Sequence, residues 1–231
     1  MSSENPSTDP ASIVIAVDGT SGSGKSSTSR GVADRLGLRY LDTGAMYRAM
    51  TWWMLSNDVD VHDADAVAAA AGKPVITSGT DPLGPRIALD GADVSVEIRS
   101  DRVNAAVSPV ATVTEVRSRL VALQQQEIER ALASGTGIVV EGRDIGTAVW
   151  PEAALKLYVT ADPAARAARR AAEEGGTDAD AVLASLESRD KIDTTKGGAA
   201  VPEGATHLDT TPYTLEQAID LVVDLAKKAG E

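Results

Sequence analysis

Residues 12–36, SIVIAVDGTSGSGKSSTSRGVADRL, decide the fold of this chain. The run Ser12–Asp18 is short, apolar and rich in β-branched residues, which is typical of a strand buried on both faces. The glycine-rich turn Gly19–Gly24 follows it at once, and Lys25–Leu36 then has a helical pattern. A buried strand that leads through a turn directly into a helix predicts the first unit of an α/β domain.

The same alternation recurs further along the chain. Short apolar runs that predict strands, each followed sooner or later by an Ala-, Leu- or Arg-rich helical stretch, lie at Thr136–Val140, Leu155–Thr160 and His207–Thr210. Thr214–Lys228 has apolar residues at helical spacing and predicts a packing helix. The fold class that we predict is therefore α/β, a parallel sheet flanked by helices.

Three segments do not fit this rhythm. Residues 1–11 are polar, so we expect a mobile tail ahead of a single domain over 12–231. Pro and Gly residues separate short alternating pieces within Lys73–Arg99, and this pattern predicts a small antiparallel, β-rich insert over about 73–107. The polar, Gly-rich stretch at about 188–202 predicts a loop or lid.

Composition and charge narrow the class of protein. The chain has 231 residues, with 22 basic and 34 acidic side chains and a net charge of −12, so we do not expect a nucleic acid partner held by a broad basic face. The lack of cysteine excludes a disulfide scaffold, a thiol nucleophile and a Cys-ligated metal. No apolar run approaches the ~18 residues of a membrane helix, and the start lacks the basic and apolar parts of a signal peptide. We therefore expect a cytoplasmic monomer that binds no membrane.

The glycine-rich turn carries a phosphate-binding motif. Residues 19–26, GTSGSGKS, fit the pattern G-x-x-x-x-G-K-[ST]. Backbone N–H groups and the helix N-terminus can surround a phosphate there, Lys25 can reach the β and γ phosphates, and the Ser26 hydroxyl can ligate Mg²⁺. The motif predicts a P-loop NTPase-like sheet that binds ATP with Mg²⁺. The expected ATP-binding residues are Gly19, Thr20, Ser21, Gly22, Ser23, Gly24, Lys25, Ser26 and Ser27.

A P-loop by itself does not separate a kinase from a nucleotide-dependent switch. A guanine-nucleotide switch normally carries an Asn-Lys-x-Asp tetrad that reads the base, and this sequence has none. The D-x-x-G spacing of Asp81–Gly84 lies in the Pro- and Gly-rich insert instead of after a strand. The sequence therefore favours a kinase and keeps a regulatory switch as the alternative from another class.

Two further motifs follow predicted strands, where an open α/β sheet places its ligands. They are DTGAMYR at 42–48 and GRDIGT at 142–147. Together with the P-loop and the β-rich insert, they resemble the bacterial cytidylate kinase family from about Ile13 to the C-terminal helix. The resemblance implies transfer of the γ-phosphoryl group of Mg-ATP to CMP and dCMP, with the insert binding the nucleoside monophosphate. A kinase for UMP or another small phosphate acceptor is the alternative within the same class.

The resemblance also assigns residues. Around the transferred group it implies catalytic roles for Lys25, Arg48, Arg143 and Arg189. For substrate binding it implies Thr43, Tyr47, Arg48, Ser108, Arg117, Arg143, Asp144, Arg189, Asp193 and Lys196. Of these, Ser108, Arg117 and Asp144 would hold the pyrimidine, and Asp193 would face the ribose. The chemistry suits Asp144, because a carboxylate accepts a hydrogen bond from the cytosine N4 amino group whereas uracil offers an acceptor there. We expect Arg143 to be its charge partner.

Two positions depart from the family's pattern. Glu141 stands where an Asp is more usual before G-R-D, and we expect it to assist magnesium hydration as an acid after a strand. Lys196 stands where the lid commonly ends in Arg, and Lys cannot make the planar bidentate contact of a guanidinium group. The loop Asp209–Thr214 resembles the family's loop near the ATP adenine, and Arg166 and Arg170 lie on a helix that could approach that base.

Overall fold

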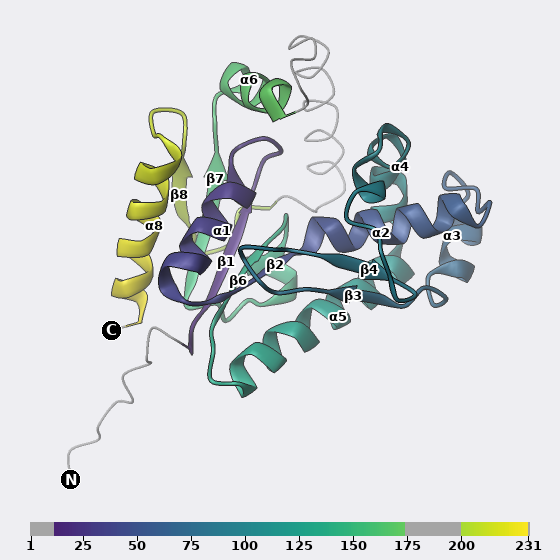
Figure 1. Ribbon diagram of the computed structural model, residues 1–231, viewed down its shortest axis with the longest axis horizontal. Helices are drawn as coiled ribbons and strands as arrows, with labels where there is room; N and C mark the ends of the chain where they lie inside the picture. The colour runs from purple at the N-terminus through teal and green to yellow at the C-terminus, as the bar shows by residue number, and fades with distance from the viewer. Residues whose placement is uncertain (1–11, 174–199, 231) are drawn as a thin grey trace.

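A parallel sheet lies at the centre of the computed structural model, which describes residues 12–173 and 200–230 (Figure 1). Its strands are β1 (Val14–Gly19), β2 (Arg39–Asp42), β6 (Ile138–Glu141), β7 (Leu155–Thr160) and β8 (Thr206–Asp209). Their order across the sheet is β2-β6-β1-β7-β8, and each neighbouring pair is parallel. The predicted α/β fold with a parallel sheet is confirmed.

Helices α1 (Lys25–Leu36) and α8 (Leu215–Ala229) cover one face of this sheet, and α2 (Thr43–Ser56) and α5 (Thr114–Ala133) cover the other. Further helices are α3 (Ala64–Ala70), α4 (Asp101–Ala111) and α6 (Pro163–Glu173). Shorter helical turns are the 3-10 turn Glu97–Arg99 and the π-helical turn Ile145–Val149. Figure 1 shows α1 and α8 side by side, while α2 and α5 belong to the other side of the sheet.

Apolar side chains of β1 alternate between the two faces. Val14 and Ala16 belong to a buried cluster that reaches α2, α4, α5 and the insert. Ile15 and Val17 belong to a second cluster with α1, α8 and β7. This alternation is the period of two that a strand imposes, and β1 is buried along its length because helices cover both faces.

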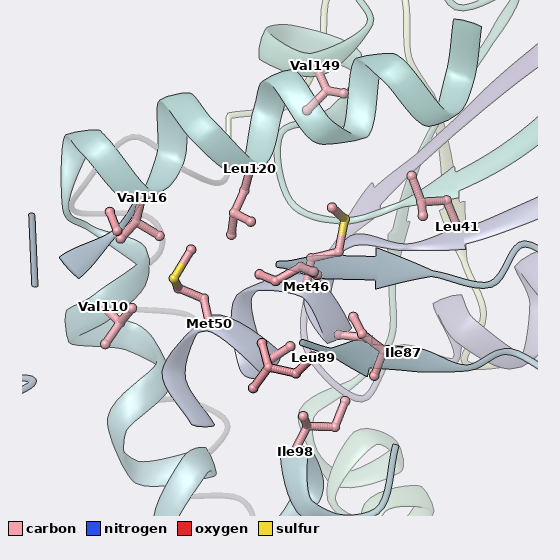
Figure 2. Packing of buried hydrophobic residues seen from close by; sticks show 14 of the residues in the cluster. Leu41, Met46, Met50, Ile87, Leu89, Ile98, Val110, Val116, Leu120 and Val149 are labelled. Atoms are coloured by element: carbon pink, nitrogen blue, oxygen red, sulfur yellow. The ribbon is translucent and has the colours of Figure 1, made fainter. Parts of the chain in front are cut away.

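Three methionines belong to the first cluster. Met46, Met50 and Met54 are buried at a spacing of four residues on one face of α2, and Figure 2 shows the first two packed among aliphatic side chains. A flexible thioether side chain fills irregular space well, which suits a chain that has no Phe. Trp52 and Trp53 are partly buried and pack against the same cluster.

An antiparallel sheet lies where the β-rich insert was predicted, but it is shorter than the predicted range of about 73–107, because helix α4 begins at Asp101. The strands of this sheet are β3 (Ile76–Ser78), β4 (Ile87–Leu89) and β5 (Ala92–Asp93), in that order. The two-residue turn Asp90-Gly91 joins β4 to β5 with φ angles of 51° and 86°, as a tight hairpin requires. The backbone N–H of Tyr40 donates to the Thr80 carbonyl at 2.9 Å, which ties the insert to the core.

The strands and helices whose bounds the sequence predicted begin and end within two residues of those bounds. The helix Lys25–Leu36 and the strand Leu155–Thr160 are confirmed residue for residue. The strand expected from Thr136 begins at Ile138, because the residues before it close helix α5: Gly135 has a φ of 74°, and the Thr136 N–H donates to a carbonyl of that helix at 3.1 Å. Local capping therefore displaced a strand start that hydrophobicity alone had placed too early.

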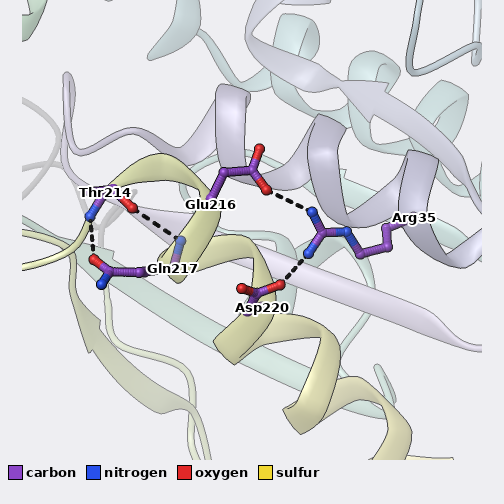
Figure 3. Close-up of polar contacts among 5 residues, drawn as sticks. All are labelled: Arg35, Thr214, Glu216, Gln217 and Asp220. Carbon is purple, nitrogen blue, oxygen red and sulfur yellow. Dashed lines mark hydrogen bonds and ion pairs between the residues drawn. The ribbon is translucent and has the colours of Figure 1, made fainter.

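The last helix is fixed at its first turn (Figure 3). Thr214 and Gln217 form a capping box: the Gln217 N–H donates to Thr214 Oγ1 at 3.3 Å, and the Thr214 N–H donates to Gln217 Oε1 at 2.9 Å. Arg35, at the end of α1, forms ion pairs with Glu216 and Asp220, one turn apart on α8. These contacts set the start of α8 and hold it beside α1.

Parts of the predicted domain plan lie outside the described residues, namely the tail at 1–11 and the lid residues 188–199. The end of the predicted lid is described: Pro202 is buried, and a Cβ added to Gly146 would lie 2.9 Å from its Cγ. Within the ranges 12–173 and 200–230, no helix combines the length and the apolar character needed to cross a membrane.

Candidate functional site

The loop between β1 and α1 has a shape that depends on glycine. Gly19 has a φ of 140° and lies so close to β7 that a Cβ would be 1.9 Å from the Val159 carbonyl oxygen. Gly22 and Gly24 have φ angles of 74° and 85°, in the left-handed region that other residues disfavour. The loop backbone can therefore approach a phosphate group closely.

Side chains donate hydrogen bonds to carbonyl oxygens of this loop. Lys25 Nζ donates to the Thr20 carbonyl at 2.6 Å, and Ser23 Oγ donates to the same oxygen at 2.8 Å. Arg143 Nη1 donates to the Gly19 carbonyl at 2.9 Å. These contacts hold the cationic groups of Lys25 and Arg143 against the loop, where their charge favours a bound anion.

Side chains of helix α6 contact the same loop. Arg166 is 6% exposed, and its Nη1 donates to the Ser21 carbonyl at 3.0 Å. Arg169 donates to both the hydroxyl and the carbonyl of Thr210 at 2.9 Å, and the Thr210 hydroxyl donates to the Ser23 carbonyl at 2.8 Å. Arg166 thus contacts the phosphate loop, and Arg169, which the sequence did not single out, contacts it both through Thr210 and directly at the Ser23 carbonyl, at 3.5 Å.

An acidic side chain with an unpartnered oxygen lies at the end of β6. Glu141 is 4% exposed, and its Oε1 accepts a hydrogen bond from the Tyr40 hydroxyl at 2.6 Å. Within the described residues its Oε2 has no hydrogen-bond partner. Burial, with a smaller contribution from Asp42, raises the pKa of Glu141 to about 7, and the charge of Lys25 opposes this rise. A buried carboxylate oxygen beside the P-loop, with the exposed Ser26 hydroxyl at the start of α1, fits the expected Mg²⁺.

The start of α2 is fixed to the end of β6. Asp42 caps the helix, with its Oδ1 accepting the Ala45 N–H at 2.9 Å. Thr43 is buried, and its hydroxyl donates to the Glu141 carbonyl at 2.7 Å. A Cβ added to Gly142 would lie 2.6 Å from Thr43 Oγ1. Thr43 therefore joins the DTGAMYR segment to the GRDIGT segment through its own hydroxyl.

Helices α2 and α4 face each other beside this junction. Arg48 of α2 donates a hydrogen bond to Asn104 Oδ1 of α4. Ser108 lies four residues after Asn104, so the two share one face of α4. The structure thus places Arg48 and the partly buried Ser108, both predicted to bind substrate, on facing helices.

Three more predicted residues lie together. Arg117 of α5 forms an ion pair with Asp144, which is 7% exposed. Burial, and then the charge of Asp144, raise the pKa of Tyr47 to about 12, while Arg117 opposes this rise. One expectation is corrected: Asp144 pairs with Arg117, whereas Arg143 turns to the Gly19 carbonyl, because consecutive side chains leave the backbone in different directions.

Sequence reasoning missed a buried carboxylate beneath this cluster. Asp18, at the end of β1, has no exposed surface, and its two oxygens accept the N–H groups of Ile145 and Gly146 at 2.8 Å each. A charged residue that ends an otherwise apolar strand was a usable signal. Tyr40, the partner of Glu141, gave no comparable signal, because an aromatic residue in a strand is ordinarily a packing residue.

The remaining predicted residues lie outside the described residues. They are the lid positions Arg189, Asp193 and Lys196, and the side chain of Arg170. The roles that the resemblance implies for them stay predictions.

Comparisons with known proteins agree on one family. The family model for cytidylate kinase matches residues 15–228. A cytidylate kinase of Streptomyces avermitilis is 50% identical over 220 residues, which cover 94% of this chain and 93% of that protein. A cytidylate kinase of Streptomyces griseus is 52% identical over 219 residues, or 94% of each chain. The crystal structure of an uncharacterized protein from Eubacterium ventriosum is 11% identical with a TM-score of 0.53, covers 94% of this chain and 99% of that one, and shows a likeness of fold.

Proposed function

Because the chain belongs to the cytidylate kinase family, we propose that it transfers the γ-phosphoryl group of Mg-ATP to the 5′-phosphate of CMP and dCMP, giving CDP or dCDP and ADP. The observation that carries the choice of base is the buried carboxylate of Asp144, held by Arg117 beside Tyr47. The protein acts, in this proposal, as a cytoplasmic monomer on free nucleotides.

The donor phosphates bind at the loop between β1 and α1. Its amides and the N-terminus of α1 surround the phosphates, and Lys25 moves from the Thr20 carbonyl, which it contacts at 2.6 Å, to the β and γ phosphates. Ser26 would hold Mg²⁺ as a ligand, and Glu141 would assist its hydration. The metal, when bound, neutralises charge that develops on the phosphate oxygens.

The acceptor side works by positioning and charge. Phosphoryl transfer needs no protein nucleophile here, because the acceptor phosphate is already an anion. Arg48 and Arg143 contact the acceptor phosphate and the transferred group, with Arg189 of the lid as a third guanidinium group. Closure of the lid over the site excludes water, whose attack on the γ-phosphate would compete with transfer.

Base selection depends on Asp144. Arg117 engages one carboxylate oxygen, and a carboxylate has further lone pairs with which to accept the cytosine N4 amino group. Uracil places an acceptor at the same position, so the same carboxylate would face O4 without a proton between them. Ser108 completes the contact to the base, and Asp193 and Lys196 of the lid face the ribose and phosphate.

The test is the substitution Asp144→Asn. An amide can turn either its oxygen or its NH₂ toward the base, so the ratio of kcat/KM for CMP to kcat/KM for UMP should decrease. This decrease should be a larger factor than any decrease in the apparent affinity for ATP. Sites that hydrogen-bond a substrate group can discriminate by ~10⁴, so the narrowing should be large. If Asp144 serves only the ion pair with Arg117, kcat/KM falls equally for both acceptors and the ratio stays constant.

A further inference from the structure

Asp18 lies in a buried position, where a charged carboxylate is energetically unfavourable. It belongs to the central strand β1, follows four apolar residues, and has no exposed surface. Burial raises its pKa, the nearby charge of Asp144 adds to the rise, and the two backbone N–H groups oppose it. An apolar side chain would avoid this desolvation. The carboxylate must therefore be explained by what it contacts.

Both oxygens of Asp18 are used on one short turn. They accept the N–H groups of Ile145 and Gly146 at 2.8 Å each, from residues that lie 127 and 128 positions later in the chain. These are the first two residues of the π-helical turn, so Asp18 satisfies donors that have no partner within that turn. The residue just before them is Asp144, whose carbonyl accepts the Ala148 N–H at 2.8 Å.

Asp18 also connects two halves of the site. It directly precedes Gly19, the first residue of the phosphate loop, whose carbonyl accepts a hydrogen bond from Arg143 at 2.9 Å. The segment that carries Arg143 and Asp144 is thus attached to the end of β1 and the loop through the Arg143 side chain, through the Asp18 carboxylate and through the Gly142 N–H, which donates to the Val17 carbonyl at 3.0 Å.

We propose that Asp18 is a positioning residue for acceptor selection: it fixes the backbone at Asp144 so that the Asp144 carboxylate faces the base, and it does so without touching the nucleotide. This inference rests on the proposed function, in which Asp144 reads the base. The N–H groups of Ile145 and Gly146 require two acceptors on one side chain, and the Asp18 carboxylate supplies both. Asn offers only one acceptor, and its NH₂ group would face one of the two N–H donors.

The experiment compares Asp18→Asn with the parent, using CMP and UMP as separate acceptors and hydrogen exchange of residues 143–149 as a second readout. We expect kcat/KM for CMP to fall by roughly 10- to 100-fold, as small displacements within a site do. The CMP-to-UMP ratio should narrow, and exchange of the turn should become faster. Asp63→Asn is the matched control, because Asp63 caps α3 through two backbone N–H groups away from the site. Val222→Ala, on the buried face of α8, controls for lost stability.

Combining Asp18→Asn with Asp144→Asn separates the possible outcomes. If Asp18 acts through Asp144, Asp18→Asn leaves the ratio unchanged once Asp144 has been replaced. An equal loss for CMP and UMP in Asp18→Asn, while Asp144→Asn alone narrows the ratio, overturns the inference and leaves the proposed function standing. A constant ratio in Asp144→Asn overturns the base-reading role itself, and the inference with it. If Asp18→Asn does not fold, Asp18→Ser, which also has fewer acceptors and no charge, serves for the same comparisons.

Discussion

Replacing Glu141 with Gln should stabilise the folded protein at neutral and higher pH. Glu141 is 4% exposed, and its pKa is raised from 4.5 to about 7, chiefly by burial. Between these two pH values the folded state holds a proton that the unfolded state has released, so the free energy of unfolding falls as the pH rises. Each pH unit is worth ~1.4 kcal/mol, so the parent loses up to ~3 kcal/mol over this range that the Gln variant retains.

The assay is chemical unfolding of the parent and Glu141→Gln in metal-free buffer, from about pH 5 to about pH 8. Gln keeps the size of the side chain and can still accept the hydrogen bond from Tyr40, so the difference reports the charge. Glu129→Gln is the control: Glu129 is exposed on α5, and its replacement should change the free energy of unfolding by less than ~0.5 kcal/mol. The reasoning is refuted if Glu141→Gln is the less stable protein at the upper end of the range, or if its advantage does not grow with pH.

Three further substitutions test other parts of the site. Lys25→Met should leave the circular dichroism spectrum unchanged and remove most turnover, because the Lys25 ammonium group lies at the phosphate loop and not in the apolar core; near-normal turnover by a folded variant would end the P-loop assignment. Lys196→Arg should improve or leave unchanged the apparent affinity for one substrate in steady-state kinetics, since a guanidinium group adds a second hydrogen bond; a clear loss of activity would show that the roles of Asp193 and Lys196 are assigned wrongly. Gly142→Ala should lower the free energy of unfolding by ~1–3 kcal/mol, and with it the midpoint of thermal unfolding, because the added Cβ would lie 2.6 Å from Thr43 Oγ1 and from Ile145 Cδ1. An unchanged midpoint would contradict the contact between these segments.

Local signals predicted much of the fold. The helix Lys25–Leu36 and the strand Leu155–Thr160 have their predicted bounds. Glycine and β-branched residues have strong local conformational preferences, and such preferences can be recognised from a short stretch of sequence. Thr214 was predicted as the first residue of the last helix but is its N-cap, which moves the helix start by one residue. Such an error is small because capping and helix positions are adjacent in the chain.

Long-range pairing was harder to predict at the site. Asp144 was expected to pair with Arg143, its neighbour in sequence, but its partner Arg117 lies 27 residues away on α5. A charged residue in an apolar strand marks Asp18 as unusual, but its role depends on a turn 127 residues later, and no local pattern in β1 shows which N–H groups it binds. A motif therefore identified the residue types of the site, whereas packing of distant elements decided which of them meet.

The most direct test of the central claim is the rate of ADP formation from Mg-ATP with each nucleoside monophosphate offered separately. We predict strong acceleration by CMP and dCMP, with stoichiometric CDP or dCDP, and far slower turnover with UMP, AMP or GMP. Preference for UMP would contradict the base-reading role of Asp144, and slow ATP hydrolysis that no acceptor accelerates would contradict the assignment of a kinase.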